Sequence, residues 1–172
     1  MSRRPTTLIA TALAASLLVA LGVASVSAGS QRALVAKITM TGDQEVVGTG
    51  PTPSCAPPAL CGDEDAVGTA KVQIVPALDR VCIRIDWTGI DGAVWGAHIH
   101  GPADTTHAAG ILVPLLMLTP GAADNLSGTD SLDVCVTDAD ADAIAANPSA
   151  YYLNVHSFPR FNPGAIRAQL SD

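Results

Sequence analysis

Two segments of the chain alternate histidine with apolar residues, and imidazole is the side chain that most often binds copper or zinc. Residues 95–103 contain His98 and His100, and residues 151–157 contain His156. Side chains of a strand point alternately to its two faces, so His98 and His100 share one face. If the two segments are neighbouring strands, the three imidazoles converge outside the hydrophobic core, and we expect them to face the surrounding medium.

Three such imidazoles could bind copper or zinc at about 2.0–2.1 Å. His107, in the loop after the first segment, could approach the same site, and Asn154 could orient a ligand by a hydrogen bond. Arg167 and Gln169 occupy the polar face of the last predicted strand and are expected beside His156. Two other interpretations remain open: a hydrogen-bonded polar cluster that joins strands, and a catalytic site.

Eight short segments with strand-like apolar patterns, separated by turn residues, predict an all-β fold. We expect an antiparallel Greek-key sandwich or barrel. Asp91-Gly92 predicts a hairpin between two strands. One short helix is expected over residues 138–146, beginning at Thr137 or Asp138 and ended by Asn147-Pro148. The predicted strands are residues 34–41, 66–75, 80–88, 94–100, 111–118, 127–136, 151–157 and 165–170.

The chain has four cysteines, which predict two disulfides if the protein is exported. In residues 81–87 the apolar side chains take the inward positions, so Cys82 falls on the outward face. Cys135 takes the outward position in a similar segment, and we therefore predict a Cys82–Cys135 disulfide and a small loop closed by Cys55–Cys61. A zinc site built from the thiols is disfavoured because export makes disulfides the expected state.

The first residues have the features of a cleaved signal peptide: Arg3 and Arg4, an apolar run over residues 8–21, and small residues that end at Ala28. We expect cleavage after Ala28, one β domain over residues 29–172, no membrane anchor, and a location outside the cell, at the envelope exterior or in the periplasm. The net charge of −7 argues against nucleic acid as a partner. An extracellular protein or an envelope component is the expected partner.

Five separated segments together resemble the CHRD domain, a family named after chordin. These segments are Thr-Gly-Asp-Gln-Glu-Val at 41–46, Gly-Ala-His-Ile-His-Gly-Pro at 96–102, Asn-Pro at 147–148, Tyr-Tyr-Leu-Asn-Val-His at 151–156 and Pro-Gly-Ala-Ile-Arg-Ala-Gln-Leu at 163–170. The resemblance implies an all-β, immunoglobulin-like sandwich or barrel and an extracellular binding or structural role. No hydrolase, phosphate-loop or dinucleotide motif accompanies it, so the sequence gives no indication of an enzyme.

A more local resemblance concerns residues 85–101, which look like the copper-binding strand of Cu,Zn superoxide dismutase. Val155-His156 is similar to that family's later copper-ligand strand. This resemblance implies a copper or zinc site on the outside of a barrel. The chain lacks that family's bridging histidine and zinc-ligand cluster, so dismutase activity is not expected.

Overall fold

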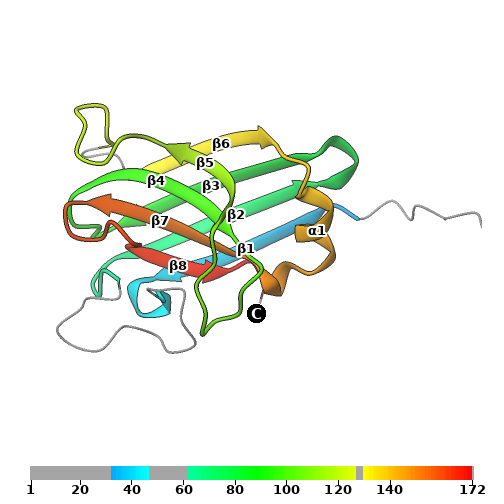
Figure 1. The fold of residues 1–172 in the computed structure, drawn as a ribbon, viewed down its shortest axis with the longest axis horizontal. Helices are drawn as coiled ribbons and strands as arrows, with labels where there is room; N and C mark the ends of the chain where they lie inside the picture. Colours follow the sequence, from blue (N-terminus) through cyan, green and yellow to red (C-terminus); the bar gives the residue numbers. More distant parts are fainter. Residues whose placement is uncertain (1–31, 47–61, 127–129, 172) are drawn as a thin grey trace, which may run out of the picture.

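The computed structural model describes residues 32–46, 62–126 and 130–171, which form one antiparallel sheet of eight strands (Figure 1). The strand order is β5-β4-β7-β8-β1-β2-β3-β6, and the sheet curls into a nearly closed barrel. The predicted all-β antiparallel fold with one short helix is therefore confirmed, in its barrel form. The predicted signal peptide and the predicted Cys55–Cys61 disulfide lie outside the described residues.

Every predicted strand is present, most of them with bounds shifted by one or two residues. The helix α1 begins later than predicted, because Asp138 and Asp140 first form a turn in which the Asp140 amide donates to Asp138 Oδ1 at 2.9 Å. The elements are β1 Leu34–Thr41, β2 Val67–Val75, β3 Arg80–Thr88, β4 Ala93–His100, β5 Ile111–Met117, β6 Ser131–Thr137, α1 Ala141–Ala146, β7 Tyr152–Phe158 and β8 Ile166–Gln169.

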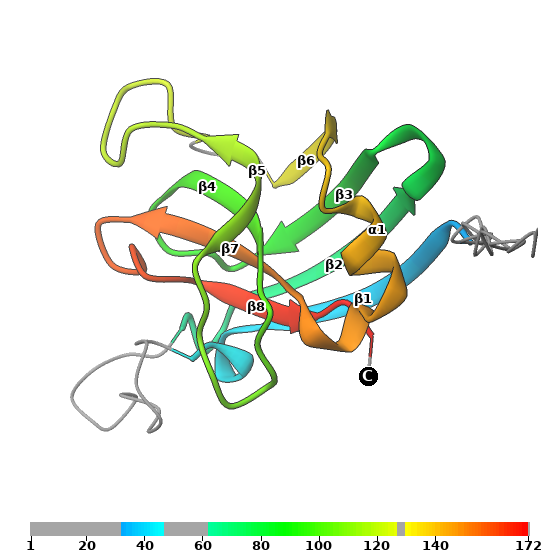
Figure 2. The same cartoon turned by 45° about the vertical axis from the view of Figure 1, so that its right-hand side comes forward.

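The sheet consists of two four-stranded halves, which Figure 2 shows as two curved walls. One half is β6-β3-β2-β1 and the other is β8-β7-β4-β5, and a single register pair, Thr41 with Arg167, joins β1 to β8. The outer strands β5 and β6 are the two free edges of the sheet. The predicted Asp91-Gly92 hairpin is wrong, since β3 pairs with β2 and β6 whereas β4 pairs with β5 and β7. This turn instead carries the chain from one half to the other.

The barrel interior holds the apolar core that the alternating pattern predicted. On β3 the side chains of Val81, Ile83 and Ile85 are buried, and α1 closes one end of the barrel with Ala141 and Ile144. Cys82 and Cys135 lie directly opposite each other on the outer face of β3 and β6 and form a disulfide, with an S–S distance of 2.02 Å. The predicted Cys82–Cys135 bridge is thus confirmed.

The half of the sheet made by β4, β7 and β8 is covered on both of its faces. Its inner face contributes Ile99 and Val155 to the core, while its outer face lies beneath the segment between β4 and β5. Arg167 Nη2 donates to the Asp104 carbonyl at 2.6 Å, and Gln169 Nε2 donates to the Ala103 carbonyl at 2.9 Å, so this segment is held against the outer face. Among the described residues, no helix is long and apolar enough to span a membrane.

Candidate metal centre

The three histidines of the two His-containing strands form one cluster. One ring nitrogen of each of His98, His100 and His156 lies within 4.8 Å of the others. The strands bring them together because β4 and β7 are antiparallel neighbours, with His98 opposite Asn154. The predicted convergence of the rings is confirmed. Their predicted exposure is wrong: His98 is 0% exposed and His100 and His156 are each 6% exposed, because the segment between β4 and β5 and neighbouring side chains cover this face.

A β-bulge and a glycine make room for the rings. The register of β4 against β7 shifts between Val94 and Gly96, which turns both Trp95 and Gly96 away from the core. The Trp95 ring lies 5.2 Å from the His156 ring, centroid to centroid. A Cβ atom on residue 96 would come within 2.8 Å of His98 Cε1. Bulges commonly re-aim side chains beside functional sites, and this one determines where the imidazoles lie.

Backbone carbonyls fix the orientation of two of the rings. His100 Nδ1 lies 3.0 Å from the Ala109 carbonyl, and His156 Nδ1 lies 3.0 Å from the Asn162 carbonyl. A carbonyl can only accept, so each Nδ1 carries the proton and each Nε2 presents a lone pair. Both Nε2 atoms are buried and have no hydrogen-bond partner among the described residues. This is the arrangement by which proteins orient metal-binding histidines.

His98 differs from the other two in its contacts. Its Nε2 lies 3.1 Å from the sulfur of Met117 on β5, and its buried Nδ1 has no hydrogen-bond partner among the described residues. The cluster therefore holds three buried nitrogens without partners, one from each ring.

Burial keeps the imidazoles neutral. Burial and, to a smaller extent, the neighbouring His156 and His100 lower the pKa of His98 to about 3. Burial also lowers the pKa of His156 to about 4 and lowers the pKa of His100. At neutral pH the three rings are therefore uncharged, which is the form that binds metal ions.

A second set of buried polar side chains adjoins the histidines. Asn154 Nδ2 donates to Glu45 Oε2 at 2.7 Å, and burial raises the pKa of Glu45 to about 8 although the Arg167 charge opposes this shift. The Arg167 guanidinium lies 3.5 Å from the centre of the Tyr152 ring, and Tyr152 stacks on His100 with ring centroids 4.9 Å apart. Arg167 Nη2 also donates to Gln169 Oε1 at 3.0 Å. Arg167 thus reaches the histidines through Tyr152 and holds Gln169 beside it, whereas Asn154 donates to Glu45 and not to a histidine.

A family model for the CHRD domain matches residues 36–170, which include the cluster and the side chains around it. The chain belongs to the CHRD domain family. No curated protein and no solved structure matches the chain. Membership supports a binding or structural module, and the likeness to superoxide dismutase remains a local one.

The segments that carry the CHRD resemblance meet at this site. Glu45 comes from the first segment, His98 from the second, Asn154 from the fourth and Arg167 from the fifth. Gly164 also belongs to the fifth segment, and it lies where a Cβ atom would overlap the Glu45 carboxyl group. The close approach of Glu45 to Asn154 therefore depends on a glycine at this position.

Sequence reasoning missed three residues at the site and included one that lies elsewhere. Glu45, Trp95 and Met117 were not predicted to take part, although Glu45 stands within the first segment of the CHRD resemblance. His107 lies in the segment between β4 and β5, where its exposed ring pairs with Asp104 at 2.8 Å instead of joining the three clustered histidines. The sequence did not indicate Met117, because its contact with His98 depends on the pairing of β5 with β4.

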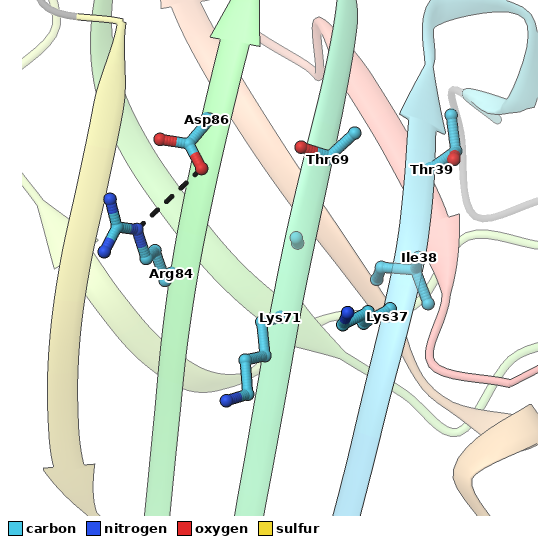
Figure 3. A pocket seen from close by; sticks show the side chains of 8 residues that line it. Lys37, Ile38, Thr39, Thr69, Lys71, Arg84 and Asp86 are labelled. Carbon is cyan, nitrogen blue, oxygen red and sulfur yellow. Dashed lines mark ion pairs between the residues drawn. The ribbon is translucent and has the colours of Figure 1, made fainter.

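The other half of the CHRD domain carries a shallow hollow on the outer face of β1, β2 and β3 (Figure 3). Lys37, Lys71 and Arg84 stand in one row across these strands, and Arg84 pairs with Asp86 at 3.8 Å. The residues that line this hollow include no histidine or cysteine. These charges are typical of an exposed surface, and the carboxylate of Asp86, which also lines the hollow, already pairs with Arg84.

Proposed function

We propose that this protein is an exported CHRD-domain module that binds one copper or zinc ion through His98, His100 and His156. The supporting observation is that the buried Nε2 atoms of His100 and His156 lack hydrogen-bond partners among the described residues, and that one ring nitrogen of each of the three histidines lies within 4.8 Å of the others. Buried polar atoms are nearly always paired, so these unpartnered nitrogens indicate a missing ligand. Copper and zinc are the ions that a set of imidazole nitrogens suits best.

The rival interpretation is a polar cluster that only joins strands. Such a cluster is stabilising when its members are satisfied, as Gln169 is by the Ala103 and Ser149 carbonyls. The three histidines do not fit this description, because none of them bonds to another among the described residues. A cation bound by one nitrogen of each ring would give the Nε2 atoms of His100 and His156 the partner that they lack.

The fixed orientation of the rings also supports metal binding. Ala109 and Asn162 hold His100 and His156 with Nε2 free, so binding needs no change of tautomer in these two rings. The Arg167 guanidinium lies over the Tyr152 ring and donates to the Asp104 carbonyl, and the electron density of these two groups reduces its repulsion of a cation. The Cys82–Cys135 disulfide supports the proposed export, since disulfides persist outside the reducing cytosol.

The test is metal analysis of protein purified without a histidine tag, after incubation with copper or zinc and removal of free metal. We expect about one ion per chain in the wild type and none in the His98→Ala, His100→Ala double variant. His107→Ala is the matched control, because it removes an exposed imidazole, and it should keep the ion.

A second variant separates metal binding from folding. Gly96→Ala places a methyl group within 2.8 Å of the His98 ring and should displace this ring with little change in the core. Its affinity for zinc should fall by about tenfold or more while its circular dichroism spectrum stays unchanged. Copper should also quench the fluorescence of Trp95, whose ring lies 5.2 Å from that of His156. A wild-type protein that binds neither metal would refute the proposal.

A further inference from the structure

We infer that Met117 is a fourth, thioether ligand of this site and that it makes the site selective for copper(I). The inference rests on the proposed histidine site and concerns which metal and oxidation state that site holds. It starts from one contact, in which the Met117 sulfur lies 3.1 Å from His98 Nε2.

The pairing of β4 with β5 places this sulfur at the cluster. Met117 stands opposite Gly96, two residues before His98, and the register of β5 against β4 shifts between Ala97 and His98. A Cβ atom on residue 96 would lie 3.2 Å from the same His98 Nε2. Because glycine has no side chain, the methionine and the imidazole can occupy this space together.

The distance suits two ligands of one metal ion. Metal–nitrogen bonds of about 2.0 Å and metal–sulfur bonds of about 2.3 Å put neighbouring donor atoms of a tetrahedral ion about 3.5 Å apart. The observed 3.1 Å needs only a small movement of the flexible methionine. If His98 Nε2 carries the proton in the metal-free protein, this proton moves to the unpartnered Nδ1, so ligation by Nε2 releases no proton.

The softness of the donor determines the metal. Thioether sulfur binds copper(I) well and contributes little to zinc or to copper(II), which three imidazoles bind without it. Met117 is also the exposed member of the group, at 59% exposure, whereas the three histidines are buried. An incoming copper(I) ion therefore meets a soft ligand at the surface before it reaches the buried nitrogens.

The experiment compares the wild type with Met117→Leu, which keeps an apolar side chain of similar size and removes the sulfur. Copper(I) affinity is measured without oxygen by competition with a coloured copper(I) chelator, and zinc affinity by competition with a zinc indicator. We expect Met117→Leu to weaken copper(I) binding by about tenfold or more and to leave zinc binding within about twofold. X-ray absorption of the copper(I) form should show a sulfur ligand in the wild type and none in the variant.

The outcomes separate this inference from the proposed function. If the wild type binds neither zinc nor copper(I), the histidine site itself is refuted. If the wild type binds both metals and Met117→Leu keeps the full copper(I) affinity, the histidine site stands and the role of Met117 is refuted. Equal weakening of zinc and copper(I) would also refute the selectivity, since it would indicate a structural role of Met117 in placing His98.

Discussion

Mild acid should destabilise the metal-free protein through its buried histidines. Folding lowers the pKa of His98 from 6.5 to about 3 and that of His156 from 6.5 to about 4. The unfolded state therefore binds protons that the folded state does not bind. The contribution of these histidines to the free energy of unfolding is fully present above pH 6.5 and is lost as the pH falls towards the two folded pKa values. At pH 5.0, 1.5 units below the unfolded value, each ring costs about 2 kcal/mol, or about 4 kcal/mol for the two. The pKa of His100 is lowered too, which adds to this loss.

Glu45 acts in the opposite direction over the same pH range. Its pKa rises from 4.5 to about 8 on folding, so its contribution to stability is largest below pH 4.5 and is lost as the pH rises towards 8. From pH 7.5 to pH 5.0 this carboxyl group should restore about 3 kcal/mol. The wild type should therefore show only a small net change, and Glu45→Gln, which keeps a neutral side chain of the same shape, should reveal the loss caused by the histidines.

The assay is urea denaturation at pH 7.5 and pH 5.0 in the presence of a metal chelator. In Glu45→Gln the free energy of unfolding should be about 4 kcal/mol lower at pH 5.0, a large fraction of the 5–15 kcal/mol typical of a domain. Adding His156→Asn to this variant should reduce the loss by about 2 kcal/mol. Adding His107→Ala to Glu45→Gln instead is the control for an exposed imidazole, and this variant should keep most of the loss of unfolding free energy at pH 5.0. Equal stability of Glu45→Gln at the two pH values would refute the reasoning that burial keeps the histidines neutral.

Two further predictions concern the scaffold. Gly42→Ala should destabilise the protein by about 3 kcal/mol or prevent folding, because its methyl group would overlap the backbone of Asp63, and thermal denaturation measures this loss; an unchanged melting temperature would contradict it. Replacing Cys82 and Cys135 together with serine should cost about 4 kcal/mol, since the bridge closes a loop with a sequence separation of 53, and urea denaturation with and without reductant checks this value. A double variant that matches the oxidised wild type would show that the bridge does not stabilise the fold.

The sequence predicts the strands well because each of them alternates between a core face and an outer face. In β3 this alternation places Val81, Ile83 and Ile85 inside and Cys82 outside, which also determines the partner of Cys135. It does not determine which strands pair. Asp91-Gly92 has the residues of a tight hairpin, yet β3 pairs with β6, which follows more than forty residues later. Local turn preferences are weak compared with the pairing of whole strands.

The part of the candidate site that was predictable from the sequence is the set of side chains that share one face of β4 and β7. Alternation places His98 and His100 on one face and His156 on the corresponding face of β7, which is how the structure arranges them. Their burial was not predictable, because it depends on the segment between β4 and β5 that Arg167 and Gln169 hold in place. Glu45 and Met117 were missed for the same reason, since their positions follow from tertiary contacts with Asn154 and His98.

The barrel is not closed between β5 and β6, so each of these strands has one edge without a paired strand. Free strand edges can recruit a strand from another molecule and start aggregation. On the β5 edge, Pro114 has no amide hydrogen that could bond to a strand of another molecule. The register shifts of β5 against β4 also make the spacing of its backbone donors and acceptors irregular. On the β6 edge, the Cys82–Cys135 disulfide joins β6 to β3, so β6 cannot separate from the sheet and expose the backbone of β3. Both features oppose the pairing of β5 and β6 with strands of other molecules.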